Sequence, residues 1–178
     1  GSDLAVFRAG RDLTDRHCDL VFIEFAVNDY YVEPQKRSRS REGLIRKLLK
    51  QNDCDIVLTY TYRQEMYQDM AENRVPHSVA EFETLAEHYG ISSVWMGQYA
   101  FDEVRKGRMK WEDWLPDGLH PQSRGSLSYA QSVIHYLRAA LSGQQETPRR
   151  NAVPPALSGQ QESPGRDAVP PALYADNW

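Results

Sequence analysis

An aspartate and a histidine stand three residues apart in a short loop that two prolines restrict. The loop reads Trp114-Leu-Pro-Asp-Gly-Leu-His-Pro121, and its ionisable groups are Asp117 and His120. This spacing lets the carboxylate contact the imidazole and orient it, while the other ring nitrogen faces a nucleophile or substrate. The pair is a candidate His–Asp base unit. The competing interpretation is a loop aspartate and a helix-entry histidine with purely structural bonds.

A second candidate is the segment Glu24-Phe-Ala-Val-Asn-Asp-Tyr30, where an apolar run ends in two polar residues. The amide of Asn28 can donate to an oxyanion, and Asp29 can fix the loop by accepting hydrogen bonds from backbone N–H groups. Taken alone, the segment favours the simpler interpretation of an Asn-Asp turn.

The elements that must position these residues are alternating helices and strands. Apolar runs predict buried parallel strands over residues 19–27, 55–60 and 91–96. Helices are expected from Ser2 or Asp3, over about 41–51, before Gly90, and over about 122–141. This order predicts an α/β three-layer sandwich with a mostly parallel sheet. Its carboxyl edge is where reactive groups gather, and a strand ending at Val27 places Asn28 there.

Two of these predicted helices are recognised by apolar residues at helical spacing. The first helix offers Leu4, Phe7 and Leu13. The last helix offers Leu127, Ala130, Val133, Ile134, Leu137 and Leu141.

A basic run lies on and before the second helix, and in a chain of net charge −4 it favours a solvated helix face over a site for an anionic substrate or surface. Its members are Lys36, Arg37, Arg39, Arg41, Arg46, Lys47 and Lys50.

The two candidate segments carry a family resemblance. Ala26-Val27-Asn28-Asp29 resembles the Gly-x-Asn-Asp block of the SGNH (GDSL-type) hydrolases, with Ala for Gly, and Asp117-Gly118-Leu119-His120 resembles their Asp-x-x-His block. Gly125 and Tyr129-Ala130 in the following helix stand in familiar places. The resemblance covers about residues 3–141, and the two blocks occur in the family's order.

The resemblance implies a flavodoxin-like hydrolase fold and a serine esterase, lipase or carbohydrate deacylase. In such an enzyme His120 removes the proton of a serine, Asp117 orients His120, Asn28 donates to the oxyanion, and Asp29 supports the loop. No metal or cofactor is implied, and no third ligand shares a zinc-type spacing with Asp117 and His120. The substrate expected is a small acyl ester or an acylated carbohydrate, with acyl transfer also compatible.

The sequence departs from the family at its beginning. Neither the Gly-Asp-Ser block that carries the nucleophile nor the second block with its oxyanion glycine is visible. Gly1-Ser2-Asp3-Leu4 has similar letters in the wrong order, and no strand precedes it. We therefore expect an N-terminally truncated hydrolase domain that lacks its first strand or strands and its serine. The alternative function is a non-catalytic hydrolase-like module that binds glycan or another partner.

The C-terminal part differs in composition from the rest. Residues 140–155 return with few changes as residues 156–171, rich in Pro, Gln and Ser. Two such copies with few large apolar residues cannot bury a core, so residues 142–172 are expected to form a disordered linker after a hydrolase domain at 1–141. Residues 173–178 regain aromatic character and are read as the start of a further segment.

Charge and hydropathy limit the partners. Lys and Arg number 21 against 25 Asp and Glu, which argues against nucleic acid as the main partner. No apolar run approaches the roughly 20 residues of a membrane-spanning helix. If a central strand is missing, the exposed strand edges make self-association possible. The sequence leaves localisation open.

Overall fold

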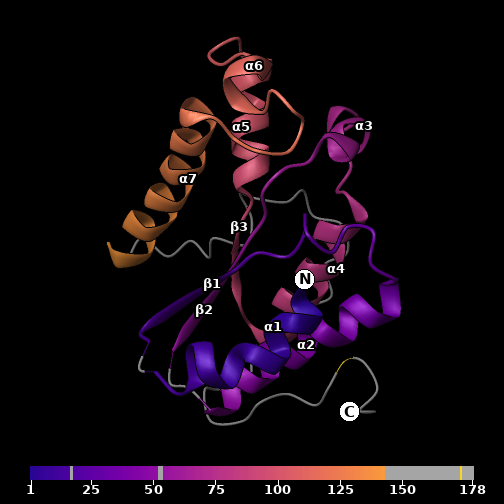
Figure 1. The fold of residues 1–178 in the computed structure, drawn as a ribbon. Helices are drawn as coiled ribbons and strands as arrows, with labels where there is room; N and C mark the ends of the chain where they lie inside the picture. Colours follow the sequence, from indigo (N-terminus) through magenta and orange to yellow (C-terminus); the bar gives the residue numbers. More distant parts are fainter. Residues whose placement is uncertain (17, 52–53, 143–172, 174–178) are drawn as a thin grey trace. The chain divides into compact units, whose positions relative to one another are not determined.

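The computed structural model describes residues 1–16, 18–51, 54–142 and 173. The predicted linker and the segment after it fall almost entirely outside these residues. The elements occur in the order α1 (Ser2–Ala9), a π-helical turn (Gly10–Thr14), β1 (Leu20–Ile23), α2 (Pro34–Gln51), β2 (Asp55–Thr59), a 3₁₀ turn (Gln64–Met66), α3 (Tyr67–Ala71), α4 (His77–Tyr89), β3 (Ser92–Val94), α5 (Met96–Arg105), α6 (Trp111–Trp114) and α7 (Ser123–Leu141) (Figure 1).

The strands form one parallel sheet in the order β1-β2-β3, which confirms the predicted α/β class. β1 and β2 are parallel, with Leu20 opposite Asp55 and Ile23 opposite Leu58. The ladder continues past β2, because the Tyr60 N–H donates to the Val94 carbonyl at 3.0 Å. Parallel neighbours need a crossover connection, and α2 provides the one between β1 and β2.

β1 is shorter than its apolar run predicts, since it ends at Ile23 instead of Val27. The Glu24 side chain accepts a hydrogen bond from the Val27 N–H, and the Asp29 N–H donates to the Phe25 carbonyl at 3.0 Å. These bonds close a turn directly after the strand. Ala26 and Val27 are therefore buried in a turn, so their apolar character reflects burial and not an extended backbone.

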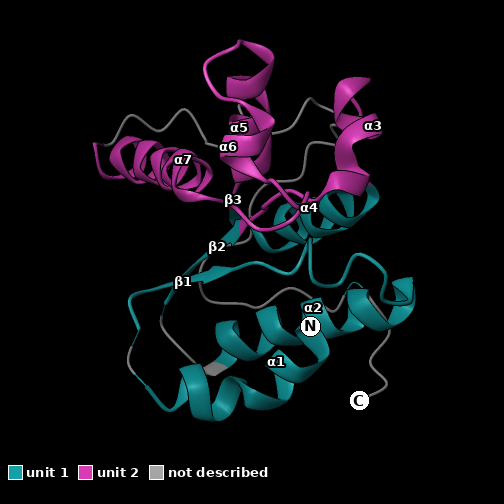
Figure 2. Cartoon of the chain, turned by 45° about the horizontal axis from the view of Figure 1, so that its top comes forward, with its two compact units in different colours: residues 1–58, 77–92, 158–178 teal, residues 59–76, 93–157 magenta. Residues whose placement is uncertain are grey.

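The chain forms two compact units, coloured separately in Figure 2. Unit 1 holds residues 1–58 and 77–92 together with Leu173, and unit 2 holds residues 59–76 and 93–142. In unit 1, α1 lies along α2, and the core includes Ile45, Leu48, Leu58, Phe82 and Leu85.

The apolar residues Leu4 and Phe7 do not form the buried face of the first helix. Phe7 is 80% exposed and Leu4 is also exposed, whereas Ser2 and Ala9 are the buried residues of α1. α1 packs against α2, and polar contacts join the two helices: Lys47 donates to the Val6 carbonyl at 3.2 Å, and Lys36 pairs with Asp3 at 3.0 Å.

α2 begins earlier than expected, at Pro34. The Glu33 carboxylate accepts hydrogen bonds from the N–H groups of Gln35 and Lys36, at 2.9 and 2.8 Å. A carboxylate and a proline are both favoured at this end of a helix, because the first N–H groups have no partner within it. Gly90 ends α4 as expected, with a φ of 68°.

Unit 2 packs around an aromatic cluster. Tyr62 and Trp114 have ring centroids 4.6 Å apart, and Trp111 stacks on Trp114 at 5.1 Å. The Trp114 indole and the Tyr62 main-chain N–H both donate to the Tyr129 hydroxyl oxygen, at 3.2 and 3.3 Å. Burial raises the pKa of Tyr62. The rings of Tyr62, Trp114 and Tyr129 are buried core residues, and Trp111 is half-buried.

The buried face of α7 likewise does not follow its apolar stripe. Leu127, Ile134 and Leu141 are exposed, whereas the helix buries Gly125, Ser128, Tyr129 and Ser132. Gly125 explains this choice, because a Cβ there would lie 2.6 Å from the Trp114 ring and 2.8 Å from its carbonyl oxygen. The missing side chain of Gly125 lets α7 approach Trp114 of α6 this closely.

No helix among the described residues has both the length and the apolar character to cross a membrane.

Candidate active site

The Asp117–His120 loop connects α6 to α7 in unit 2. His120 Nδ1 lies 2.7 Å from Asp117 Oδ2. A carboxylate only accepts hydrogen bonds, so the Nδ1–H of His120 is the donor. This contact selects the tautomer in which Nε2 carries a lone pair and can accept a proton. The contact that the spacing predicts is thus present.

Backbone groups of the same loop hold the carboxylate. Asp117 Oδ1 accepts hydrogen bonds from the N–H groups of His120, at 2.7 Å, and Leu119, at 2.9 Å. These bonds hold the pKa of Asp117 far below its usual value: the largest cause is the His120 main-chain N–H, followed by the His120 ring and the Leu119 N–H. Asp117 therefore stays ionised at neutral pH.

Gly118 sets the shape of this loop. Its φ is +79°, a conformation that residues with a Cβ rarely adopt. A Cβ on Gly118 would also lie 2.9 Å from the Cβ of Gln64, whose main-chain N–H donates to the Gly118 carbonyl at 2.9 Å. The side chains that this loop presents are open to solvent, with 76% of His120 and 55% of Asp117 exposed.

Asn28 lies in the turn that follows β1, in unit 1. Its side chain is exposed, whereas Asp29 beside it is buried. The turn is closed by bonds from the Tyr30 N–H to the Val27 carbonyl at 3.2 Å and from the Val32 N–H to the Asp29 carbonyl at 2.9 Å. Asp29 Oδ1 accepts a hydrogen bond from the Ser2 main-chain N–H at 3.0 Å. The buried carboxylate therefore ties the start of α1 to this turn.

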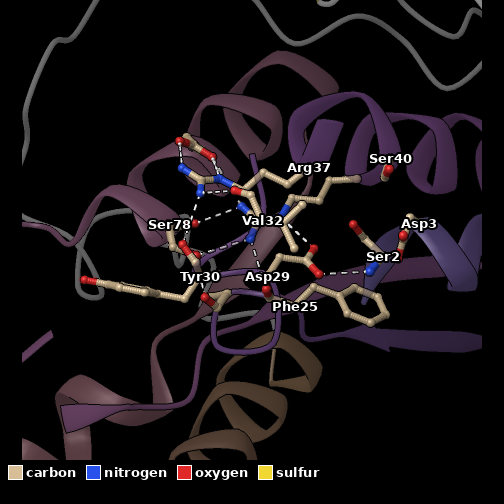
Figure 3. A network of polar contacts seen from close by, with 12 residues as sticks. Ser2, Asp3, Phe25, Asp29, Tyr30, Val32, Arg37, Ser40 and Ser78 are labelled. Atoms are coloured by element: carbon tan, nitrogen blue, oxygen red, sulfur yellow. Dashed lines mark hydrogen bonds and ion pairs between the residues drawn. The ribbon is translucent and has the colours of Figure 1, made fainter. Parts of the chain in front are cut away.

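Two arginines of the basic run support the same turn, and sequence reasoning missed them (Figure 3). Arg41 donates to Asp29 Oδ2 at 3.3 Å and to the Phe25 carbonyl at 2.9 Å. Arg37 donates to the carbonyls of Tyr30, at 3.1 Å, and Val32, at 2.7 Å.

The predicted solvated face is therefore wrong for Arg37 and Arg41. The signal that could have found them is their spacing, because they continue the stripe of buried apolar residues at Leu44, Ile45 and Leu48. A long arginine on such a stripe can extend past the apolar core to reach polar groups beyond it.

Helix α4 completes the network with Ser78 and Glu81. Arg41 donates to the Ser78 carbonyl at 3.1 Å and stacks over the Phe82 ring, 4.1 Å from its centroid. Arg37 binds both carboxylate oxygens of Glu81. Burial lowers the pKa of Arg41, and the charges of Asp29 and Glu81 oppose this shift. A guanidinium stays protonated in proteins, so the network contains two cations and two anions.

The structure describes each candidate in its own unit: Asn28 and Asp29 in unit 1, and Asp117 and His120 in unit 2. Among the described residues, no group of three or more His, Cys, Asp or Glu side chains is placed to hold a metal ion.

The comparisons with known proteins find esterases among the solved structures that resemble this chain. No family model and no curated protein matches the chain. Among solved structures, it is similar to a two-domain esterase active on acetylated mannans, with a TM-score of 0.66 and 25% identity over 91% of this chain and 40% of that one. A structure of such an esterase co-crystallised with mannopentaose gives a TM-score of 0.65, 25% identity, and coverage of 91% and 39%. The chain thus spans about 40% of the length of these neighbours and has an α/β, esterase-like fold.

Proposed function

We propose that this chain belongs to a serine ester hydrolase of the SGNH type and supplies its oxyanion donor, Asn28, and its base unit, Asp117–His120. The observation that carries the proposal is the hydrogen bond from His120 Nδ1 to a carboxylate that stays ionised, which leaves Nε2 as a proton acceptor. We place Asn28 and His120 in one reaction because the Asn-Asp block and the Asp-x-x-His block occur in the order found in the SGNH family.

The mechanism follows from these groups. His120 Nε2 removes the proton of a hydroxyl nucleophile, whose oxygen attacks the acyl carbonyl while Asp117 stabilises the imidazolium. The Asn28 amide donates to the oxyanion that forms. The imidazolium then protonates the leaving alkoxide, and the bond from the acyl carbon to that oxygen breaks. Water repeats the sequence and releases the acid.

The serine nucleophile is proposed to lie outside these 178 residues. Ser2 is the serine whose neighbouring residues most resemble the family's Gly-Asp-Ser block. However, Ser2 is 1% exposed, and its main-chain N–H donates to Asp29 at the start of α1. A buried hydroxyl in this position is a poor nucleophile for a polymeric ester. Loop support by Asp29 is part of the proposal.

The substrate class proposed is an acylated carbohydrate. The support is the similarity to esterases active on acetylated mannans, at 25% identity. An acetyl group on a sugar hydroxyl is a small acyl ester, which the mechanism can cleave without a cofactor.

A substitute nucleophile tests this function in the chain as it exists. Hydroxylamine attacks the acetyl carbonyl, passes a proton to His120, and yields acetohydroxamic acid and the free alcohol. We expect the full chain to form hydroxamate from acetylated mannan and p-nitrophenyl acetate faster than buffer does. His120→Ala should lose about 100-fold of the enzymatic rate, the usual contribution of general base catalysis.

His135→Ala is the matched control, because it removes another exposed histidine of unit 2. Hydroxamate formation that is equal in the chain and in His120→Ala would contradict the proposal. Ester hydrolysis without hydroxylamine that disappears in Ser2→Ala would contradict the placement of the serine outside the chain.

The alternative function is a non-catalytic hydrolase-like module that binds glycan, and the structural neighbour co-crystallised with mannopentaose motivates it. Calorimetric binding of mannopentaose, without any His120-dependent hydroxamate formation, would support this alternative over the hydrolase.

A further inference from the structure

The turn that carries Asn28 has its carbonyl oxygens bound by side chains on both sides of that residue. Before Asn28, the Phe25 carbonyl accepts from Arg41, and the Ala26 carbonyl accepts from the Ser78 hydroxyl. After Asn28, the carbonyls of Tyr30 and Val32 both accept from Arg37. Side chains of α2 and α4 thus hold the turn at four points (Figure 3).

The two arginines act as one support. They stand one helical turn apart on α2, and both reach Glu81 of α4: Arg37 through a bidentate pair, and Arg41 at 3.6 Å. The side chain of Arg41 is 0% exposed, and that of Arg37 is 5% exposed. The guanidinium fork can bind several oxygens in one plane, which an ammonium group cannot do.

Such a network is a costly way to stabilise a fold. Burying charged groups carries a desolvation cost that their attraction repays only when the geometry is good, and apolar side chains of similar volume often stabilise a core as well or better. What a fully bonded polar network does provide is one fixed backbone geometry. The feature that is fixed here is the turn that presents Asn28.

We propose that Arg41, assisted by Arg37, is a positioning residue that fixes the Asn28 turn so that the Asn28 amide can serve as an oxyanion donor. The inference rests on the proposed function for the role of Asn28. An oxyanion donor is effective only when it is aimed before the charge develops, and a misplacement of about 1 Å can cost about 100-fold in rate.

Amide hydrogen exchange, measured by NMR on the full chain, tests the support of the turn. In Arg41→Lys the charge remains but the fork is lost. We expect the N–H groups of Asp29, Tyr30 and Val32 to exchange at least about tenfold faster, because the turn opens locally. The matched control is Arg46→Lys, which loses a hydrogen bond from the same helix, α2, to the Tyr89 hydroxyl of α4.

If Arg41→Lys does not fold, Ser78→Ala takes its place. This substitution removes the hydroxyl that donates to the Ala26 carbonyl and accepts from Arg41. It leaves Arg41 paired with Asp29, so no buried charge loses its ionic partner. Faster exchange confined to the turn supports the proposal. Equal exchange of these three N–H groups in Arg46→Lys and in the Arg41 or Ser78 variant overturns it.

The link from the turn to chemistry is tested with the hydroxamate reaction. We expect Arg41→Lys to lower the maximal rate about tenfold or more with an unchanged KM for the ester. The substitution changes the orientation of the Asn28 amide toward the oxyanion, whereas it does not change substrate binding. Adding Asn28→Ala to Arg41→Lys should then cost little more, since residues that act as a unit are not additive. Fully additive losses would overturn the positioning role.

A wild-type chain without any hydroxamate activity would refute the proposed function, while the exchange measurement still decides whether Arg41 holds the turn.

Discussion

The Asn28 turn is held by residues from distant parts of the sequence, whereas the Asp117–His120 loop is held largely by its own backbone. Asp29 bonds to Ser2, 27 residues away, and Ala26 accepts a bond from Ser78, 52 residues away. Asp117 instead receives all its bonds from positions two and three residues later. The turn therefore depends on the packing of unit 1, whereas the Asp117–His120 contact needs only bonds within its own loop, which Gln64 supports through one bond to the Gly118 carbonyl.

The largest effect that follows from this difference concerns Arg41. Arg41→Met keeps most of the side-chain volume but leaves the buried Asp29 carboxylate without its cation. Removing one partner of a buried pair typically costs about 3–5 kcal/mol, so we expect a loss of this size in the free energy of unfolding. Urea denaturation measures it. His120→Ala is the comparison and should change this free energy by less than about 0.5 kcal/mol, because its side chain is exposed.

The next effect concerns two glycines with positive φ. Gly118 has a φ of +79° and Gln64 close by, whereas Gly107 has a φ of +71° and open space around it. Alanine at either position costs about 1–2 kcal/mol for the left-handed backbone. Gly118→Ala must in addition displace Gln64.

We therefore expect Gly118→Ala to be the more destabilising substitution in thermal melts. It should also be the one that shifts the NMR signals of Asp117 and His120. Equal melting temperatures for the two variants would show that the contact with Gln64 does not restrict this loop.

A smaller effect concerns how the free energy of unfolding depends on pH under acidic conditions. The pKa of Asp117 is lowered on folding, so Asp117 contributes stability above its ordinary pKa of 3.8, and this contribution is lost as the pH falls through the lower folded value. Asp117→Asn should accordingly weaken the dependence of the unfolding free energy on pH below about pH 4. Denaturation curves across this range measure the change.

The titration of the Asp117 carboxyl carbon, followed by ¹³C NMR, separates the causes. Because the His120 main-chain N–H contributes most to the lowered pKa, His120→Ala should leave the pKa of Asp117 still clearly below 3.8. A return to the ordinary value in His120→Ala would show that the ring, not the backbone, holds the carboxylate.

The sequence allowed the local contacts to be predicted, but not the long-range ones. The contact between Asp117 and His120 follows from a spacing of three residues and could be predicted without knowing the fold. The burial of Arg37 and Arg41 depends on Glu81 and Ser78 of α4, 37 to 44 residues away, and charge alone indicates a solvated face instead.

The choice of the buried helix face also depends on long-range contacts. In α7 the close approach of Gly125 to Trp114 decides which side is buried, and it outweighs the apolar stripe of Leu127, Ile134 and Leu141. The alternation of helices and strands predicts the α/β class correctly, because periodicity reports local structure. Periodicity does not predict which other element a helix packs against.

The tautomer of His120 tests the central claim most directly, because a base must offer an unprotonated Nε2. ¹⁵N NMR of the full chain at about pH 9, well above the ordinary histidine pKa of about 6.5, distinguishes the two neutral forms. We predict a proton on Nδ1 in the native chain and a shift toward the Nε2–H form in Asp117→Asn, whose amide can donate to Nδ1. A native His120 with its proton on Nε2, or a tautomer that does not change in Asp117→Asn, would contradict the assignment of Asp117–His120 as a base unit.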